Sequence, residues 1–168
     1  MHASSVIQLS RRTIFAVALI AGISGCASSS KPTNLADTLA KTPALSTLNG
    51  LVVQAGLSET LKSAGPFTVF APNNDAFKAV PAKTMEELAK DPQKLKAVLT
   101  YHVLPAQIAA ADVKNSKAKT VQGADIELSK SGEFVTVESA FVTQADIPAS
   151  NGVIHMIDTV LIPPAPKK

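Results

Sequence analysis

An α+β fold is predicted by the order of the local signals in the sequence and by its length. Residues 34–102 carry most of the helix signals, with apolar residues at helical spacing and capping residues at the boundaries. From residue 103 onward, short β-prone stretches alternate with turns that contain glycine. The stretch 34–163 is long enough for one domain around one hydrophobic core. Helices followed by mostly antiparallel strands, rather than alternating with them, indicate the α+β class.

The first half of the domain is expected to contain a series of short helices. Asn34 is the expected N-cap of the first helix, and Gly56 follows the second as a stop. Thr84 and Glu87 have the spacing of a capping box, and Asp91 precedes a proline at the first position of the last helix. The expected helical stretches are 34–42, 44–55, 58–63, one capped by Asn73 or Asn74, one from residue 84 and one from residue 91.

The strands are expected mainly in the second half. One β-prone run, residues 67–70, lies between Pro66 and Pro72 within the helical half. In the last expected strand His155 shares one face with two aliphatic residues, and the opposite face is also apolar, so this strand is expected to be central. The later strands are expected over residues 117–122, 125–129, 133–137, 141–147 and 153–162.

Residues 1–25 are predicted to be a cleavable export signal. Arg11 and Arg12 precede the apolar run 13–23, which is shorter than the roughly 20 residues that a membrane span requires. Residues 23–26 (ISGC) resemble the bacterial lipobox, which makes Cys26 the expected lipid-bearing first residue of the mature protein. The alternative is an ordinary cleaved signal followed by a coincidental cysteine. The arginine pair also faintly resembles a twin-arginine signal, so the export route stays open.

Lipidation at Cys26 has consequences for the rest of the chain. Residues 26–33 become the anchor and a flexible spacer, and the membrane becomes a partner through the lipid. Ala27 resembles outer-membrane sorting, so the outer membrane or cell surface is favoured over the inner membrane. Removing the signal also removes both arginines, which leaves 14 lysines against 13 acidic residues and a formal net charge of +1. An arginine-free domain without tryptophan argues against nucleic acid as a partner.

Three segments of the mature chain resemble the signature segments of the fasciclin domain family. They are residues 67–77 (FTVFAPNNDAF), 99–105 (LTYHVLP) and 151–163 (NGVIHMIDTVLIP), in the family's order and at family-like spacing. The resemblance covers residues 34–163 and implies a wedge-shaped β-sandwich with helices packed along one side and at one end. It also implies a non-enzymatic adhesion or binding role outside the cell. Residues 164–168 remain as a Pro/Lys tail.

The signature residues are candidates for binding, and each also has a structural interpretation. In some animal relatives the region of the family's Tyr-His dipeptide, here Tyr101-His102, is implicated in receptor binding. Its position at the end of an amphipathic helix predicts that at least one ring is buried and hydrogen-bonded. Asn73, Asn74 and Asp75 can satisfy the free amides of the helix that follows them. The candidate residues are Phe67, Asn74, Asp75, Phe77, Tyr101, His102, Asn151, Gly152 and His155.

The sequence contains no local motif that indicates catalysis, a cofactor or a metal. Hydrolase elbows, phosphate-binding glycine-rich loops and closely spaced metal ligands are missing. The leading hypothesis is therefore an anchored adhesion module with a protein or matrix polysaccharide as its partner. One alternative is a carrier of a lipophilic ligand such as a carotenoid, with residues 67–70 and 153–157 lining a groove. Another is a structural lipoprotein that contacts wall or matrix polymer.

Overall fold

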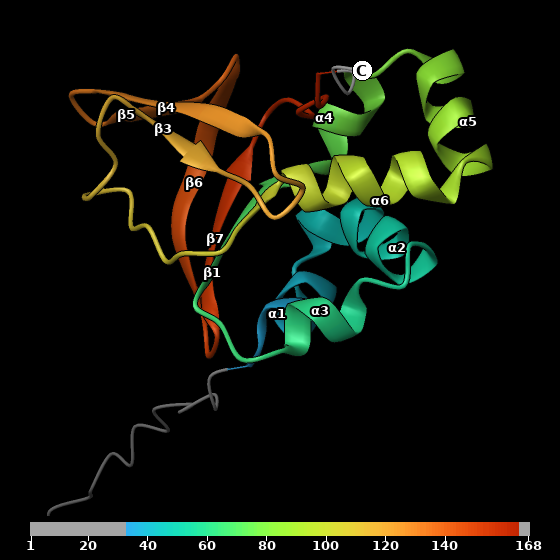
Figure 1. Ribbon diagram of the computed structural model, residues 1–168, viewed down its shortest axis with the longest axis horizontal. Coiled ribbons are helices and arrows are strands. Elements are labelled where there is room, and N and C mark those ends of the chain that lie inside the picture. Colours follow the sequence, from blue (N-terminus) through green and yellow to red (C-terminus); the bar gives the residue numbers. More distant parts are fainter. Residues whose placement is uncertain (1–32, 165–168) are drawn as a thin grey trace, which may run out of the picture.

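The computed structural model describes residues 33–164. Within that range, helices and strands are joined by short connections, with the helices gathered beside one side of a bent sheet (Figure 1). The helical elements are α1 (Leu35–Lys41), a 3₁₀ turn (Pro43–Leu45), α2 (Ser46–Gln54), α3 (Ser58–Lys62), α4 (Asn74–Ala79), α5 (Ala82–Lys90) and α6 (Pro92–Tyr101). The strands are β1 (Phe67–Pro72), β2 (Val103–Leu104), β3 (Ser116–Lys119), β4 (Asp125–Ser131), β5 (Phe134–Val137), β6 (Ala140–Ala149) and β7 (Gly152–Ile157).

The helix boundaries follow the capping residues at most of the predicted positions. The side chains of Asn34, Asn73 and Asp91 each accept a hydrogen bond from a backbone amide in the first turn of the helix that follows. The capping box predicted at Thr84 is wrong. Helix α5 begins earlier, at Ala82, so Thr84 lies inside its first turn instead of at the N-cap. Pro81 leads into this helix with φ −54° and takes the N-cap position without a side-chain bond.

The strands of the described region form one sheet in the order β2-β1-β7-β6-β5-β4-β3. Its pairs are antiparallel except for β1 and β7, which run parallel with Val69 opposite Ile154. The Val121 amide donates to the Val103 carbonyl oxygen over 2.8 Å, and this bond joins the end of β3 to the opposite edge strand. The sheet is therefore nearly closed. The α+β class is confirmed, and the two layers of the expected sandwich are the two halves of this single bent sheet.

Two hydrophobic clusters lie on either side of β1 and β7. One cluster fills the space between these strands and the helices, and it includes Val69, Ile154 and Met156. The other lies inside the bent sheet, where Phe70 and Ile157 meet residues of β4, β5 and α6. All six residues of β7 are buried, which confirms that the strand of His155 is central. The two apolar faces predicted for this strand contact these two different clusters.

The strand boundaries differ from the sequence prediction where the backbone turns. Strand β7 ends at Ile157, before the predicted residue 162, because the chain bends at Asp158 and Thr159. Strand β6 is longer than predicted and irregular, with register shifts between residues 142 and 147 against β7. One of the shifted residues, Asp146, has φ 55°. Such irregularities let a long strand follow a strongly bent sheet.

No helix between residues 33 and 164 is both long and apolar enough to cross a membrane. The predicted export signal, Cys26 and most of the spacer fall outside the described residues, as does the tail from residue 165. The described part starts beside the turn between β6 and β7, where the Ser150 amide donates to the Thr33 carbonyl oxygen over 2.9 Å. Thr33 therefore lies beside this turn.

Candidate functional site

Tyr101 and His102, at the end of α6, are both buried. The Tyr101 side chain enters the interior of the sheet, and its hydroxyl donates to Glu138 Oε1 over 3.0 Å. Burial raises the pKa of this phenol from 10.0 to about 12, and the hydrogen bond and negative charge of Glu138 add to the increase. Glu138 itself has φ 57°, so the partner carboxylate comes from a tight turn between β5 and β6. The phenol thus ties α6 to a turn 37 residues further along the chain.

Both ring nitrogens of His102 bond to the main chain. Nδ1 lies 2.7 Å from the Val98 carbonyl oxygen and donates to it, because Nε2 accepts from the Leu161 amide at 3.0 Å. This arrangement requires the neutral imidazole with its proton on Nδ1. Burial lowers the pKa of His102 from 6.5 to about 4, opposed in part by the bond to Val98. His102 holds the segment after β7 against the end of α6.

His155 organises the loop between β2 and β3. Its Nε2 lies 2.8 Å from the Ile108 carbonyl oxygen, and its Nδ1 accepts from the Asp146 amide over 3.2 Å. The imidazole also stacks on Phe70, with ring centroids 5.6 Å apart and an angle of 26° between the rings. The ring therefore bonds to the loop on one side and to the irregular part of β6 on the other.

Further polar side chains hold the same loop, and none of them belongs to the candidates predicted from the sequence. Thr68 is fully buried, and its hydroxyl donates to the Ala106 oxygen and accepts from the Ile108 amide at 2.7 and 2.9 Å. Asp146 Oδ1 accepts from the Ala110 amide over 2.9 Å, and Lys130 Nζ donates to the Ala110 oxygen over 2.8 Å. No local signal predicted these roles, because each partner is at least 20 residues away in sequence.

Asn151 connects three elements at the turn before β7. Its amide nitrogen donates to the carbonyl oxygens of Leu61 and Ser63, both at 2.8 Å, and its Oδ1 accepts from the Leu35 amide at 2.9 Å. Gly152 follows in close contact with β1, where a Cβ atom would lie 2.1 Å from the Phe67 carbonyl oxygen. Both residues are therefore required by packing between α1, α3, β1 and β7.

The first signature segment divides between core and surface. Phe77 is buried in the helical cluster, and Phe67 is half-buried against it. Asn74 reaches away from its own helix, accepting from the Thr47 amide at 3.1 Å and donating to the Pro43 oxygen at 3.0 Å. Asp75 is exposed and pairs with Lys78 at 2.7 Å. The predicted role for the polar residues here is confirmed only for Asn73, which caps α4.

The structure does not bring the candidate residues together into one open site. His102 and His155 lie in different polar networks, one at the end of α6 and one beneath the loop after β2. Among residues 33–164, no group of three or more His, Cys, Asp and Glu is arranged to hold a metal ion. In the same range, every buried polar side-chain atom has a hydrogen-bond partner. The buried histidines, Tyr101 and Asn151 are therefore internal connections, whereas Asp75 lies at the surface.

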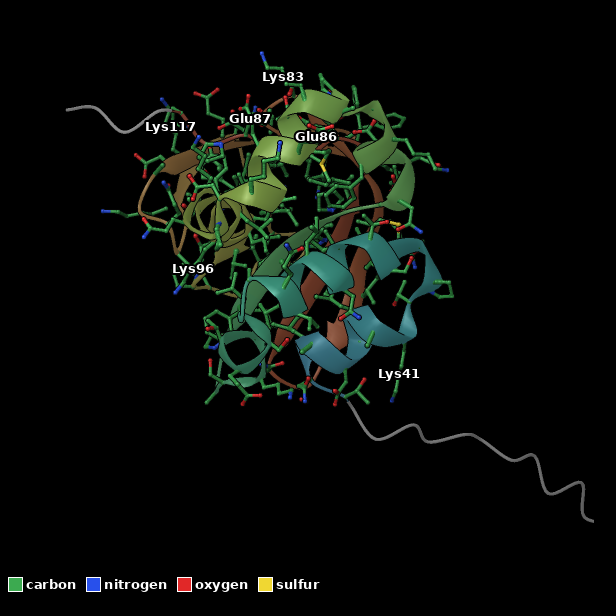
Figure 2. All side chains as sticks on the ribbon, turned by 90° about the vertical axis from the view of Figure 1, so that its right-hand side faces the viewer. Lys41, Lys83, Glu86, Glu87, Lys96 and Lys117 are labelled. Carbon is green, nitrogen blue, oxygen red and sulfur yellow. The ribbon has the colours of Figure 1, made fainter. Side chains whose placement is uncertain are left out.

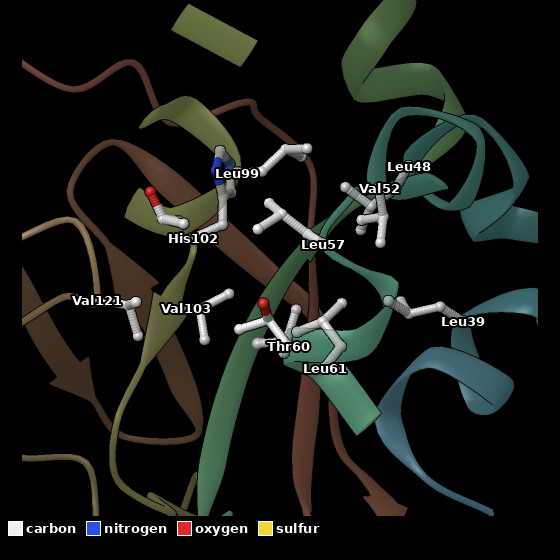
Figure 3. A pocket seen from close by; sticks show the side chains of 12 residues that line it. Leu39, Leu48, Val52, Leu57, Thr60, Leu61, Leu99, His102, Val103 and Val121 are labelled. Atoms are coloured by element: carbon white, nitrogen blue, oxygen red, sulfur yellow. The ribbon is translucent and has the colours of Figure 1, made fainter. Parts of the chain in front are cut away.

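A small apolar cavity lies between the helices and β1, next to His102 (Figure 3). Its volume is about 20 Å³, which is room for about one water molecule. Residues 67–70 and 153–157, the predicted walls of a lipophilic groove, belong to strands β1 and β7. These strands are direct neighbours in the sheet and are largely buried. The residues that line the cavity include Leu39, Leu48, Val52, Leu57, Leu61, Val69, Leu99 and Val103.

Fold and signature network together define a fasciclin-type domain, and comparison with known sequences agrees. The sequence profile of the fasciclin domain matches residues 43–163. The chain belongs to the fasciclin domain family. The solved structure of a FAS1 domain pair from the insect cell adhesion molecule fasciclin I superimposes with a TM-score of 0.60 at 22% identity, over 71% of this chain and 46% of that one. That likeness confirms the fold.

Curated relatives come from bacteria and animals. Protein sll1483 of Synechocystis is 47% identical over 121 residues, which cover 71% of this chain and 67% of that protein. The cell surface glycolipoprotein MPB83 of Mycobacterium bovis is 37% identical over 128 residues, covering 73% of this chain and 57% of MPB83. The transforming growth factor-beta-induced protein ig-h3 of Sus scrofa is 41% identical over 123 residues, but these are only 18% of its length.

Proposed function

We propose that this chain is an exported, non-enzymatic adhesion or protein-binding module, anchored through a lipid on Cys26. The observation that carries the proposal is the internal use of its signature residues: Tyr101, His102 and His155 are buried, and their polar atoms are committed to bonds within the fold. Groups held in this way stabilise a scaffold rather than act on a substrate. The outer surface is then the part of the domain available to a partner.

The proposed location is the outer membrane or cell surface. The lipobox-like segment and its cysteine support the anchor, and MPB83, which is 37% identical over 128 residues, is described as a cell surface glycolipoprotein. The tether would leave from Thr33, beside the turn between β6 and β7. One end of the domain would then face the membrane and the opposite end would face outward.

The anchor is tested on the full chain expressed in a bacterium with its own signal. Mass spectrometry of the mature N-terminal peptide is expected to show a diacylglyceryl group on Cys26, and the protein is expected in the membrane fraction. The Cys26→Ser variant is expected to lack the lipid. An unmodified cysteine at the mature N-terminus, or a mature protein that starts elsewhere, would contradict the anchor.

The adhesion role is tested with cells that display the lipidated chain. Retention on immobilised matrix proteins and polysaccharides is compared between cells with the wild-type chain and cells without it. Cells that display the chain are expected to be retained more than cells without it. Adding the soluble protein as a competitor is expected to reduce this retention. Equal retention of both cell types on every coating would contradict the adhesion role without affecting the result for the anchor.

A further inference from the structure

The outer face of β5 and β6 has no covering element among the described residues. The helices lie beside β1, β2 and β7, on the other side of the molecule (Figure 1). The inner side chains of β5, Val135 and Val137, face the cluster inside the sheet, so Phe134 and Thr136 face outward. Phe141 on β6 lies opposite Thr136 and therefore shares this outward face.

Phe134 and Phe141 are two large apolar side chains on this exposed face. Their exposed fractions are 72% and 55%. Because Thr136 lies opposite Phe141, Phe134 is a diagonal neighbour of Phe141 across the strand pair, within reach of an aromatic side chain. Paired exposed aromatic residues are typical of the centre of a protein interface. Phe134 and Phe141 are called the aromatic pair below.

Acidic side chains flank the aromatic pair along β5 and β6, and the lysines of the neighbouring strands are engaged elsewhere. Lys130 Nζ donates to the Ala110 and Ala111 oxygens, and Lys117 pairs with Glu127 at 3.3 Å. Between residues 131 and 166 the sequence contains Glu133, Glu138, Asp146 and Asp158 and no lysine or arginine. Glu133 directly precedes Phe134, and Asp158 Oδ1 accepts from the Phe141 amide at 2.9 Å. The helical side carries exposed side chains of both signs, among them Lys41, Lys83 and Lys96 and also Glu86 and Glu87 (Figure 2). A cationic partner would complement the carboxylates and could also stack on the aromatic rings.

The aromatic pair lies far from the point where the proposed anchor would join the domain. Its position therefore favours a partner that is not part of the anchoring membrane. Phe141 lies near the start of β6, whereas Thr33 is bonded beside the other end of that strand. Val142 and Ala149 lie opposite Ile157 and Gly152, which are five positions apart on β7, so Phe141 lies roughly 20 Å from Ala149 along the sheet. The carboxylates would also be repelled by an anionic lipid surface.

We propose that the outer face of β5 and β6 docks a polypeptide segment that carries both basic and apolar side chains. The aromatic pair would contact the apolar side chains, and Glu133 and Asp158 would face the basic ones. This inference names the partner chemistry of the adhesion module proposed above and rests on that function. It does not depend on the lipid itself, so the two proposals fail in different experiments.

The test uses the full-length mature chain, in nanodiscs of zwitterionic lipid where it carries the lipid and in buffer where it does not, with empty discs or buffer alone as the control for signal that does not come from the protein. A fluorescent synthetic peptide of alternating lysine and leucine is titrated by anisotropy, and the same peptide with glutamate replacing lysine is the matched probe. Saturable binding of the lysine peptide to the protein is expected in either form, and added salt is expected to weaken it. Binding of the glutamate peptide is expected to be at least about tenfold weaker.

Three variants connect this binding to the proposed face. The double variant Phe134→Ser/Phe141→Ser is expected to weaken lysine-peptide binding about tenfold or more, as loss of central interface aromatics does. Glu133→Gln is expected to weaken binding by a smaller factor, about threefold, and to reduce its salt dependence. Val53→Ser removes an exposed apolar side chain from α2, 62% exposed, and is expected to leave binding unchanged. Circular dichroism melts confirm that each variant is folded.

Several results would overturn the proposal. These are no saturable binding of the lysine peptide, equal binding of the two peptides, or wild-type binding by the folded double phenylalanine variant. Self-association that the double variant abolishes would instead assign this face to a second copy of the chain. Binding that is the same on empty discs would assign the signal to the lipid.

Discussion

His102 and Leu161 are joined by a buried hydrogen bond, in which the Leu161 amide donates to Nε2 of the imidazole over 3.0 Å. Nδ1 of the same ring donates to the Val98 oxygen. Only the neutral ring can form both bonds, because the protonated imidazole has no acceptor nitrogen. The state of one proton therefore controls a connection between residues that are 59 positions apart.

Stability is expected to fall in acid because of His102. The folded pKa of about 4 lies below the ordinary value of 6.5, so the unfolded chain binds a proton first as the pH decreases. The contribution is complete above pH 6.5 and decreases as the pH falls toward 4, by about 3 kcal/mol in all. Urea unfolding across this range measures it. A His102→Gln variant is expected to be less stable at pH 7 but to show a shallower pH dependence; parallel curves would contradict the assignment.

Tyr101 gives a second titration with the opposite sign. It is the only tyrosine and the chain has no tryptophan, so tyrosinate absorbance reports this residue alone. The phenol is expected to ionise near a pKa of about 12, and its stabilising contribution is present below pH 10 and lost as the pH rises through 12. Glu138→Gln removes the neighbouring charge and is expected to lower the pKa. A titration at the ordinary value of 10.0 in the folded protein would show that the buried bond does not form in solution.

Local sequence features predicted the parts of the fold that depend on neighbouring residues. Asn34, Asn73 and Asp91 bond to amides two or three positions ahead. Their patterns placed two helix starts, at Asn34 and Asp91, and narrowed the third to Asn73 or Asn74. The apolar faces of the His155 strand similarly predicted its central position. The Thr84 capping box failed because Pro81, three residues earlier, already led the chain into the helix. Where two helix-start signals lie within a few residues of each other, as Pro81 and Thr84 do, the local sequence is compatible with more than one N-cap position.

The connections between distant elements could not be read from the sequence. Asn151 was a candidate because of the signature, but its bond to Leu61 spans 90 residues and depends on the completed sheet. The bonds of Thr68 and Asp146 have the same property, because both residues bond to the loop after β2, 36 or more positions away in the sequence. The aromatic pair could not be predicted from the sequence for a related reason. Only the strand register shows which side of β5 and β6 faces outward.

Replacing Asn151 is expected to destabilise the domain strongly. Asn151→Ala leaves two carbonyl oxygens and the Leu35 amide without their partner, at a cost of about 2–3 kcal/mol in urea unfolding at pH 7. Asn151→Asp keeps the acceptor but places a carboxylate against the oxygens of Leu61 and Ser63, so it is expected to be as harmful or worse. Gln144→Ala truncates an exposed amide on β6 and is the matched control, with a change within about 0.5 kcal/mol. Similar effects for Asn151→Ala and Gln144→Ala would contradict the connecting role.

Two glycines are expected to respond in opposite directions to the same added methyl group. In Gly152→Ala the new Cβ would meet the Phe67 carbonyl oxygen at 2.1 Å, so the parallel strands β1 and β7 must move apart, with a loss of about 2 kcal/mol. Gly50 lies inside α2, and a Cβ there would meet nothing within 4 Å. Because alanine is the better helix former, Gly50→Ala is expected to gain about 0.5–1 kcal/mol. Thermal and urea unfolding measure the change in stability of both variants. If Gly152→Ala left the stability unchanged, β1 and β7 would not be held as closely as the register requires.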